Sequence, residues 1–147
     1  MKNNMIITIA RQYGSGGREI GKRLSEKAGY DYYDVEILDK ASQNSGLTKE
    51  TIARYDEKLK DGWMNLSAGM SSMSGRESLS IPLKAVAAQF ETIREIGKKG
   101  SAVIVGRCAD YVLKDQENVL TVFIYADMKY RIDRVAQRNG ISREEAE

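Results

Sequence analysis

Histidine is absent from the 147 residues, and the chain has only one cysteine and one proline. Without histidine it cannot form the Ser-His-Asp or Cys-His arrangements of nucleophilic catalysis, and the common zinc sites are excluded as well. The single cysteine, Cys108, excludes an internal disulfide framework and favours a reducing compartment. Any chemistry must therefore rest on carboxylates, arginines, lysines, backbone amides or an oxygen-ligated metal such as Mg²⁺.

The sequence also has no long apolar run and no strong excess of one charge. Its apolar stretches are far shorter than the ~20 residues that a membrane-spanning helix needs, and residues 5–10 are too short and too strand-like for a signal peptide. A formal charge of +2 gives no indication of a nucleic-acid partner. We therefore expect a cytoplasmic protein that binds neither membranes nor nucleic acid. Its length predicts a single domain over residues 1–147.

The most informative stretch lies between Ile6 and Leu24 and predicts a strand, a glycine-rich loop and a helix. Residues 6–9 are mostly apolar and β-branched, as in a strand covered on both faces. Three glycines follow within a few residues, and Ile20 and Leu24 then recur at helical spacing. Such a helix directs free N–H groups and the positive end of its dipole at the loop. This favours phosphate binding, and the alternative is a tight turn without a ligand.

The loop resembles the Walker A motif, G-x-x-x-x-G-K-S/T, but does not match it. No Lys-Ser or Lys-Thr pair follows the glycines, and Arg18 and Glu19 stand there instead. Arg18 would replace the charge of the lysine, although a planar guanidinium differs from an ammonium in geometry. The hydroxyl that binds Mg²⁺ in the motif is lost.

Further strands are predicted at residues 30–33, 102–105 and 119–125, with helical patterns between them. Strands that alternate with helices indicate an α/β fold with a parallel sheet. Residues 61–79 are dominated by Ser, Gly and Met and show no periodicity. We expect an irregular insertion there, either mobile or ordered as a lid. Thr48 and Asp127 are predicted helix N-caps.

Charged side chains follow two of the predicted strands, and the carboxyl ends of parallel strands meet at one edge of a sheet. Arg107 and Asp110 come after residues 102–105, and Asp34 comes after residues 30–33. Arg107 suits the recognition of phosphate or carboxylate groups, or it forms a structural ion pair with Asp110 or another carboxylate. Asp34 would hold Mg²⁺, contact a substrate hydroxyl, or cap the following helix.

Three arginines share one face of the helix that is predicted to follow Asp127. Arg131, Arg134 and Arg138 are spaced three and four residues apart, opposite the apolar face. Such a face can neutralise polyphosphate charge in a transition state, and the alternative is an ordinary solvated surface.

Four segments together resemble the cytidylate kinase-like family, which lies within the P-loop nucleoside monophosphate kinases. They are I-T-I-A-R-Q-Y-G-S-G-G-R-E-I-G, Y-D-Y-Y-D, V-I-V-G-R-C-A-D-Y-V-L and Y-R-I-D-R-V-A-Q-R. The resemblance covers nearly the whole chain apart from residues 61–79. It implies a three-layer α/β/α P-loop core, ATP as phosphoryl donor, Mg²⁺ as metal, and CMP or dCMP as acceptor.

The resemblance also implies roles for individual residues. The donor phosphates would be bound by Gly14, Ser15, Gly16, Gly17, Arg18 and Glu19. Asp34, Arg107 and Asp110 would bind the acceptor, and Mg²⁺ would be held by Glu19 or Asp34. Residues 127–147 would begin a lid. The catalytic residues would be Arg18, Arg107, Arg131 and Arg134.

These features lead to three hypotheses. The first is a nucleotide kinase that transfers the γ-phosphoryl of ATP to a nucleoside monophosphate. The altered loop favours the second, a nucleotide- or phosphate-binding module without turnover. The third is a P-loop kinase for a small non-nucleotide hydroxyl. Ser142 and Glu145 form a capping box that begins a helix just before the sequence ends, so we expect a C-terminally incomplete chain.

Overall fold

The computed structural model describes residues 4–60 and 80–147, so the irregular insertion predicted at residues 61–79 lies outside the described residues. The chain divides into two compact units. One comprises residues 1–34 and 99–147, and the other comprises residues 35–98. Each unit is described by itself below, and the prediction of a single domain stays a prediction.

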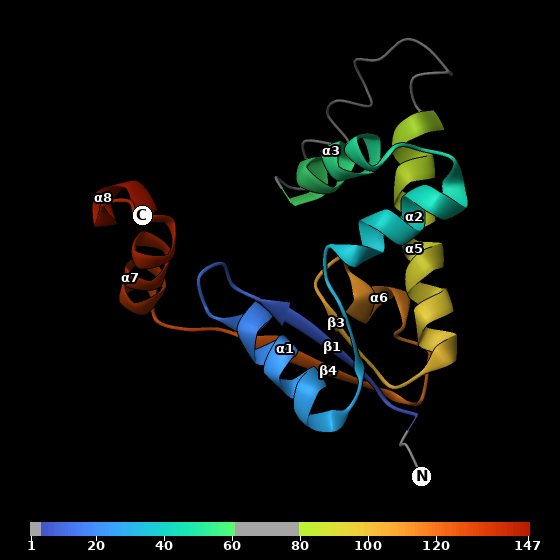
Figure 1. Cartoon of the computed structure of the whole chain (residues 1–147), viewed down its shortest axis with the longest axis horizontal. Coiled ribbons are helices and arrows are strands. Elements are labelled where there is room, and N and C mark those ends of the chain that lie inside the picture. Colours follow the sequence, from blue (N-terminus) through green and yellow to red (C-terminus); the bar gives the residue numbers. More distant parts are fainter. Residues whose placement is uncertain (1–3, 61–79) are drawn as a thin grey trace. The chain divides into compact units, whose positions relative to one another are not determined.

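The first unit is built on a parallel sheet of four strands in the order β2-β3-β1-β4 (Figure 1). The strands are β1 (Ile6–Arg11), β2 (Asp31–Tyr33), β3 (Ala102–Val105) and β4 (Val119–Ile124). Thr8 in the centre of β1 pairs in register with Ile104 of β3 and Thr121 of β4. The predicted α/β class with a parallel sheet is confirmed.

Helix α1 (Gly17–Ala28) packs closely on the sheet because it presents a glycine to it. A Cβ atom on Gly21 would lie 2.9 Å from Cγ2 of Val105 and 3.2 Å from Cδ1 of Ile9, so only a glycine fits without repacking. Beside this contact lies a core cluster of Ile7, Ile9, Val103 and Val105. The short helix α6 (Ala109–Val112) follows β3, and α7 (Met128–Asn139) and α8 (Arg143–Ala146) follow β4. Close packing of α1 fixes the position of the glycine loop that precedes it.

The second unit contains the helices α2 (Glu36–Ser45), α3 (Lys49–Lys60) and α5 (Ser80–Lys99). A second core cluster joins them, made of Leu38 and Ala41 from α2, Ile52 from α3 and Ala85 from α5. At the start of α3, the Thr48 hydroxyl accepts a hydrogen bond from the backbone N of Thr51 at 3.2 Å. The predicted N-cap is confirmed.

Three helices end at a glycine. Gly29, Gly46 and Gly140 adopt left-handed φ angles at the C-caps of α1, α2 and α7. Both hydrogen bonds of the predicted capping box are present at the start of α8. The N-cap prediction for Asp34 is wrong by one residue, because α2 begins at Glu36 with Val35 at its N-cap. The Asp34 carboxylate forms an ion pair with Arg18 instead.

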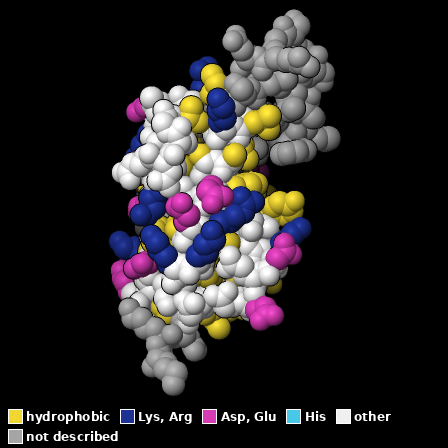
Figure 2. Space-filling model, turned by 90° about the vertical axis from the view of Figure 1, so that its right-hand side faces the viewer, with side chains coloured by type: hydrophobic (Ala, Val, Ile, Leu, Met, Phe, Trp, Pro, Cys, Tyr) yellow, Lys and Arg dark blue, Asp and Glu magenta, His cyan; other side chains and the backbone are white. Residues whose placement is uncertain are grey.

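Charges of both signs are mixed on the face of the molecule that Figure 2 shows, where lysine and arginine side chains lie beside aspartate and glutamate. Within the described ranges, no helix is long and apolar enough to cross a membrane.

Candidate functional site

The glycine loop connects β1 to α1 and reverses the chain within a few residues. Gly14 and Gly16 have φ angles of 78° and 86°, which residues with a Cβ rarely adopt. The backbone N of Ser15 donates to the carbonyl of Gln12 at 3.2 Å and closes the turn. Because the N-cap of α1 is Gly16, it has no side chain with which to cap the first turn of the helix. The N–H groups that every helix start leaves open are therefore available to a ligand here.

Ser15 in this loop carries a polar group that the rest of the protein does not satisfy. Its side chain is only 6% exposed, and within the described residues its hydroxyl oxygen has no hydrogen-bond partner. A buried hydroxyl in this state costs about 1–3 kcal/mol. An anion bound at the start of α1 would accept a hydrogen bond from this hydroxyl, so this observation points to a ligand independently of the helix start.

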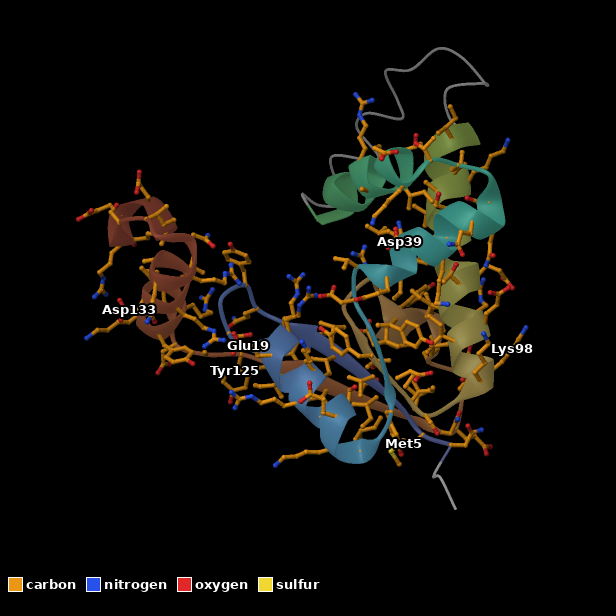
Figure 3. The ribbon with its side chains drawn as sticks, viewed as in Figure 1. Met5, Glu19, Asp39, Lys98, Tyr125 and Asp133 are labelled. Atoms are coloured by element: carbon orange, nitrogen blue, oxygen red, sulfur yellow. The ribbon has the colours of Figure 1, made fainter. Side chains whose placement is uncertain are left out.

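Arg18 and Glu19, the two residues that directly follow the glycines of the loop, are each held in an ion pair. Arg18 Nε lies 2.5 Å from Oδ2 of Asp34, whose side chain is 5% exposed, while Arg18 itself is 62% exposed. Glu19 Oε2 lies 2.5 Å from Nη2 of Arg134, which brings the start of α1 to α7 (Figure 3). The hydrogen bond from Arg134 to Glu19 raises the pKa of that guanidinium further above its usual value. Arg134 is therefore charged at all pH values of interest.

These ion pairs determine whether the carboxylates of the loop region are available to bind a magnesium ion. Glu19 and Asp34, the two predicted ligands, each already accept a hydrogen bond from an arginine. Across residues 4–60 and 80–147, no group of three or more acidic, cysteine or histidine side chains is placed to hold a metal. Magnesium commonly binds through one or two carboxylates together with substrate phosphates. The described residues do not form such a site on their own.

The predicted arginine face of α7 lies against the glycine loop. Arg131 Nη1 donates to the carbonyl of Tyr13 at 3.4 Å, and Arg138 Nη2 donates to the Tyr13 hydroxyl at 2.9 Å. A Cβ atom on Gly14 would lie 2.9 Å from the carbonyl oxygen of Arg131, so α7 requires a glycine there. The arginines of this face therefore contact the loop within the same chain, and they bring positive charge to it.

Two of the three residues predicted for the acceptor, Arg107 and Asp34, meet at this end of the sheet. Arg107 Nε donates to the backbone carbonyl of Asp34 at 2.8 Å, which joins the ends of β2 and β3 as the topology predicts. Arg107 and Cys108 have φ angles of 57° and 54°, so the chain turns sharply after β3. Asp110 lines a cavity of about 230 Å³ together with Gly106 and Cys108.

Two residues near the loop were not singled out from the sequence. The first is Tyr13, which accepts hydrogen bonds from two arginines of α7. Arg11 at the end of β1 is the other. A Cβ atom on Gly17 would lie 2.6 Å from Cβ of Arg11, and one on Gly106 would collide with Nη1 of Arg11. The available signal was the position of Arg11 five residues before Gly16, the spacing between the two glycines of the Walker A motif.

Proteins with similar sequences include several cytidylate kinases. The chain is 27% identical to a cytidylate kinase of Pyrococcus horikoshii over 146 residues, which are 99% of this chain and 63% of that protein. It is 28% identical to a cytidylate kinase of Methanococcus vannielii over 138 residues, which are 91% of this chain and 66% of that protein. The chain thus spans about two thirds of the length of these relatives, and slightly less than two thirds of the first.

A solved structure and a family profile extend the comparison. A crystal structure of an uncharacterized protein from Eubacterium ventriosum matches with a TM-score of 0.66 and 27% identity, over 97% of this chain and 66% of that one. The profile of the cytidylate kinase-like family matches residues 6–147. The chain therefore belongs to the cytidylate kinase-like family.

Proposed function

We propose that this protein is a nucleotide kinase that transfers the γ-phosphoryl of ATP to a nucleoside monophosphate, with CMP or dCMP as the acceptor. The observation that carries the proposal is the start of α1. There a buried Ser15 hydroxyl without a partner among the described residues adjoins a helix start whose N-cap is glycine. Family membership and kinase relatives support nucleotide chemistry in general.

In this proposal the protein acts mainly by position and charge. The amides of the glycine loop and the Ser15 hydroxyl bind the donor phosphates. Because donor and acceptor are then both bound to the protein, the transfer becomes effectively unimolecular. Arg131 and Arg134, which α7 brings to the loop, neutralise charge on the transferred group. Because phosphoryl transfer needs little covalent participation by the enzyme, the absence of histidine is no obstacle.

The acceptor is assigned to the residues that follow β2 and β3. Asp110 lines the cavity near the carboxyl end of β1, and Arg107 is anchored on Asp34. An anchored guanidinium suits the phosphate of a monophosphate because its fork matches phosphate oxygens. Magnesium is expected to enter with the nucleotide, since the carboxylates predicted to hold it are paired with arginines.

A specific observation favours a second candidate function, a nucleotide-binding module without turnover. Arg18 and Glu19, the two charged residues that directly follow the glycines of the loop, are each paired with another side chain of the protein. A loop that is used in this way for structure can bind phosphate without catalysing its transfer.

One assay separates the candidates. The full chain is incubated with ATP, Mg²⁺ and separate nucleoside monophosphates (CMP, dCMP, UMP, AMP and GMP), and ADP production is followed against a sample without acceptor. The kinase proposal predicts ADP production that depends on the acceptor and is highest with CMP or dCMP. Tight ATP binding without such production would contradict it and support the binding module. In a parallel set of samples with small non-nucleotide hydroxyl compounds as acceptors, turnover with these compounds alone would contradict both.

A further inference from the structure

Arg11 reaches from the end of β1 across to two glycines of neighbouring segments. Its stem lies against Gly17, where a Cβ atom would be 2.6 Å from Cβ and 2.9 Å from Cγ of Arg11. Its guanidinium lies against Gly106, directly after β3. The side chain therefore connects the first residue of α1 with the segment that carries Arg107 and Asp110. It stands between the residues proposed for the donor and those proposed for the acceptor.

Alignment of the loop with the Walker A motif shows why there is room for the Arg11 side chain beside Gly17. When Gly16 is set on the second glycine of G-x-x-x-x-G-K-S/T, the first glycine of the motif corresponds to Arg11 and its lysine corresponds to Gly17. The cation and the glycine have exchanged places. Positions 11 and 17 cannot both carry a side chain, because a Cβ atom on Gly17 would lie 2.6 Å from Cβ of Arg11, which is closer than two Cβ atoms approach. The long basic side chain comes from the strand end instead of the helix start.

Arg11 also differs from the other arginines at the loop in what it binds. Arg18 is paired with Asp34, Arg134 with Glu19, and Arg138 donates to Tyr13. Across the part of the chain that the structure describes, no hydrogen bond or ion pair engages the guanidinium of Arg11. It is half-buried, and the exposed Asp110 carboxylate lines the same cavity. A partly desolvated guanidinium with unused donors is suited to bind a phosphate in two-pronged fashion.

We propose that Arg11 contacts the donor phosphates and takes the part that the lysine has in the Walker A motif. Arg18 then serves as a positioning residue that holds Asp34, instead of replacing the charge of the motif's lysine as was expected from the sequence. This inference rests on the proposed function, since it identifies the cation of the same nucleotide site.

The test is equilibrium binding of ATP to the full chain for the wild type, Arg11→Ala, Arg18→Ala and Arg23→Ala. Arg23 lies on the exposed side of α1 and serves as the matched control. Loss of a charge-assisted contact predicts that Arg11→Ala weakens ATP binding by about tenfold or more, and that Arg23→Ala changes it by less than about twofold. Arg18→Ala should have a smaller effect than Arg11→Ala. Thermal unfolding of each variant checks that it is folded.

An exchange variant makes the test independent of how well Arg11→Ala folds. Gly17→Lys alone should abolish ATP binding, because the new Cβ collides with Arg11. The double variant Arg11→Gly with Gly17→Lys removes the collision, restores the motif order and should recover at least part of the affinity. Arg11→Lys, which keeps the stem and the charge, should bind better than Arg11→Ala.

The outcomes distinguish this inference from the proposed function. If the wild type binds ATP and phosphorylates an acceptor while Arg11→Ala binds ATP equally well, the kinase proposal stands and the role of Arg11 is overturned. A larger loss in Arg18→Ala than in Arg11→Ala would also overturn it. A wild type that does not bind ATP would overturn the proposed function and this inference together.

Discussion

The starts of α1 and α3 satisfy their backbone groups in opposite ways. Every helix start leaves N–H groups without a partner inside the helix. At α3, the Thr48 hydroxyl accepts from the backbone N of Thr51, so the chain closes its own helix start. At α1 the N-cap is Gly16, and the buried Ser15 hydroxyl beside it has no partner among the described residues. A closed start stabilises structure, whereas an open start beside an unsatisfied buried hydroxyl has donors that a ligand can use.

The two helix starts also differ in the charged side chains that surround them. An exposed pair, Lys49 with Asp39 at 2.6 Å, lies at the start of α3. At α1, Arg11 comes from β1 and Arg134 from α7, in addition to Arg18 of the helix itself. Positive side chains from three elements therefore meet at the start of α1, and only the tertiary fold brings these elements together.

The largest effect is expected where α7 rests on the loop. Gly14→Ala places a Cβ atom 2.9 Å from the carbonyl oxygen of Arg131 in a backbone with φ of 78°. We expect the free energy of unfolding to fall by about 3 kcal/mol, because strain and overpacking add, and ATP binding to be lost. Denaturant unfolding and an ATP titration measure the two effects.

Gly29 supplies the matched control for this substitution. It has a similar φ of 67°, but a Cβ atom there would meet nothing within 4 Å. Gly29→Ala should cost only the conformational strain, about 1 kcal/mol, and leave ATP binding unchanged. Equal losses of stability in the two variants would show that α7 does not press on Gly14.

A second pair of variants compares the two hydroxyls directly. Thr48→Ala removes a cap and should lower the free energy of unfolding by about 1 kcal/mol without an effect on ATP binding. Ser15→Ala removes an unsatisfied buried hydroxyl, so the stability without ligand should stay the same or rise by up to about 1 kcal/mol. Its ATP affinity should nevertheless drop by about tenfold, through loss of a hydrogen bond to a charged ligand. Destabilisation by Ser15→Ala with unchanged ATP affinity would contradict the comparison.

The smallest effect concerns the ion pairs at the two starts. Glu19→Gln removes a negative charge beside the proposed phosphates and leaves Arg134 less neutralised, so ATP binding should tighten a few-fold at low salt. The stability should change by no more than about 1 kcal/mol, because the Glu19 carboxylate is largely exposed. Asp39→Asn breaks the exposed pair with Lys49 and should not alter ATP binding. The tightening should shrink as salt is raised, and its persistence in high salt would argue against an electrostatic cause.

Features set by neighbouring residues could be predicted from the sequence. The strand, glycine loop and helix at the N-terminus, the Thr48 cap and the capping box at Ser142 all depend on residues within a few positions. The parallel sheet followed from the alternation of strands and helices. Its connectivity then brought Arg107 to Asp34, as expected for two strand ends at one edge.

Contacts between distant segments could not be read in this way. The pairing of Glu19 with Arg134, and of Tyr13 with Arg138, depends on how α7 returns to the loop. The N-cap prediction for Asp34 failed for the same reason, since a local rule cannot foresee that Arg18 pairs with the carboxylate. Arg11 resembled an ordinary residue at the end of a strand until its contacts with Gly17 and Gly106 were known.

The central claim is that the start of α1 binds the donor phosphates while that of α3 only closes its own helix. An ATP titration of the full chain, followed by the backbone amide chemical shifts in NMR spectra, tests this most directly. The claim predicts the largest shifts at the amides of residues 14–19, with those of residues 48–52 almost unmoved. Shifts that are equal at the two starts, or largest outside residues 14–19, would contradict it.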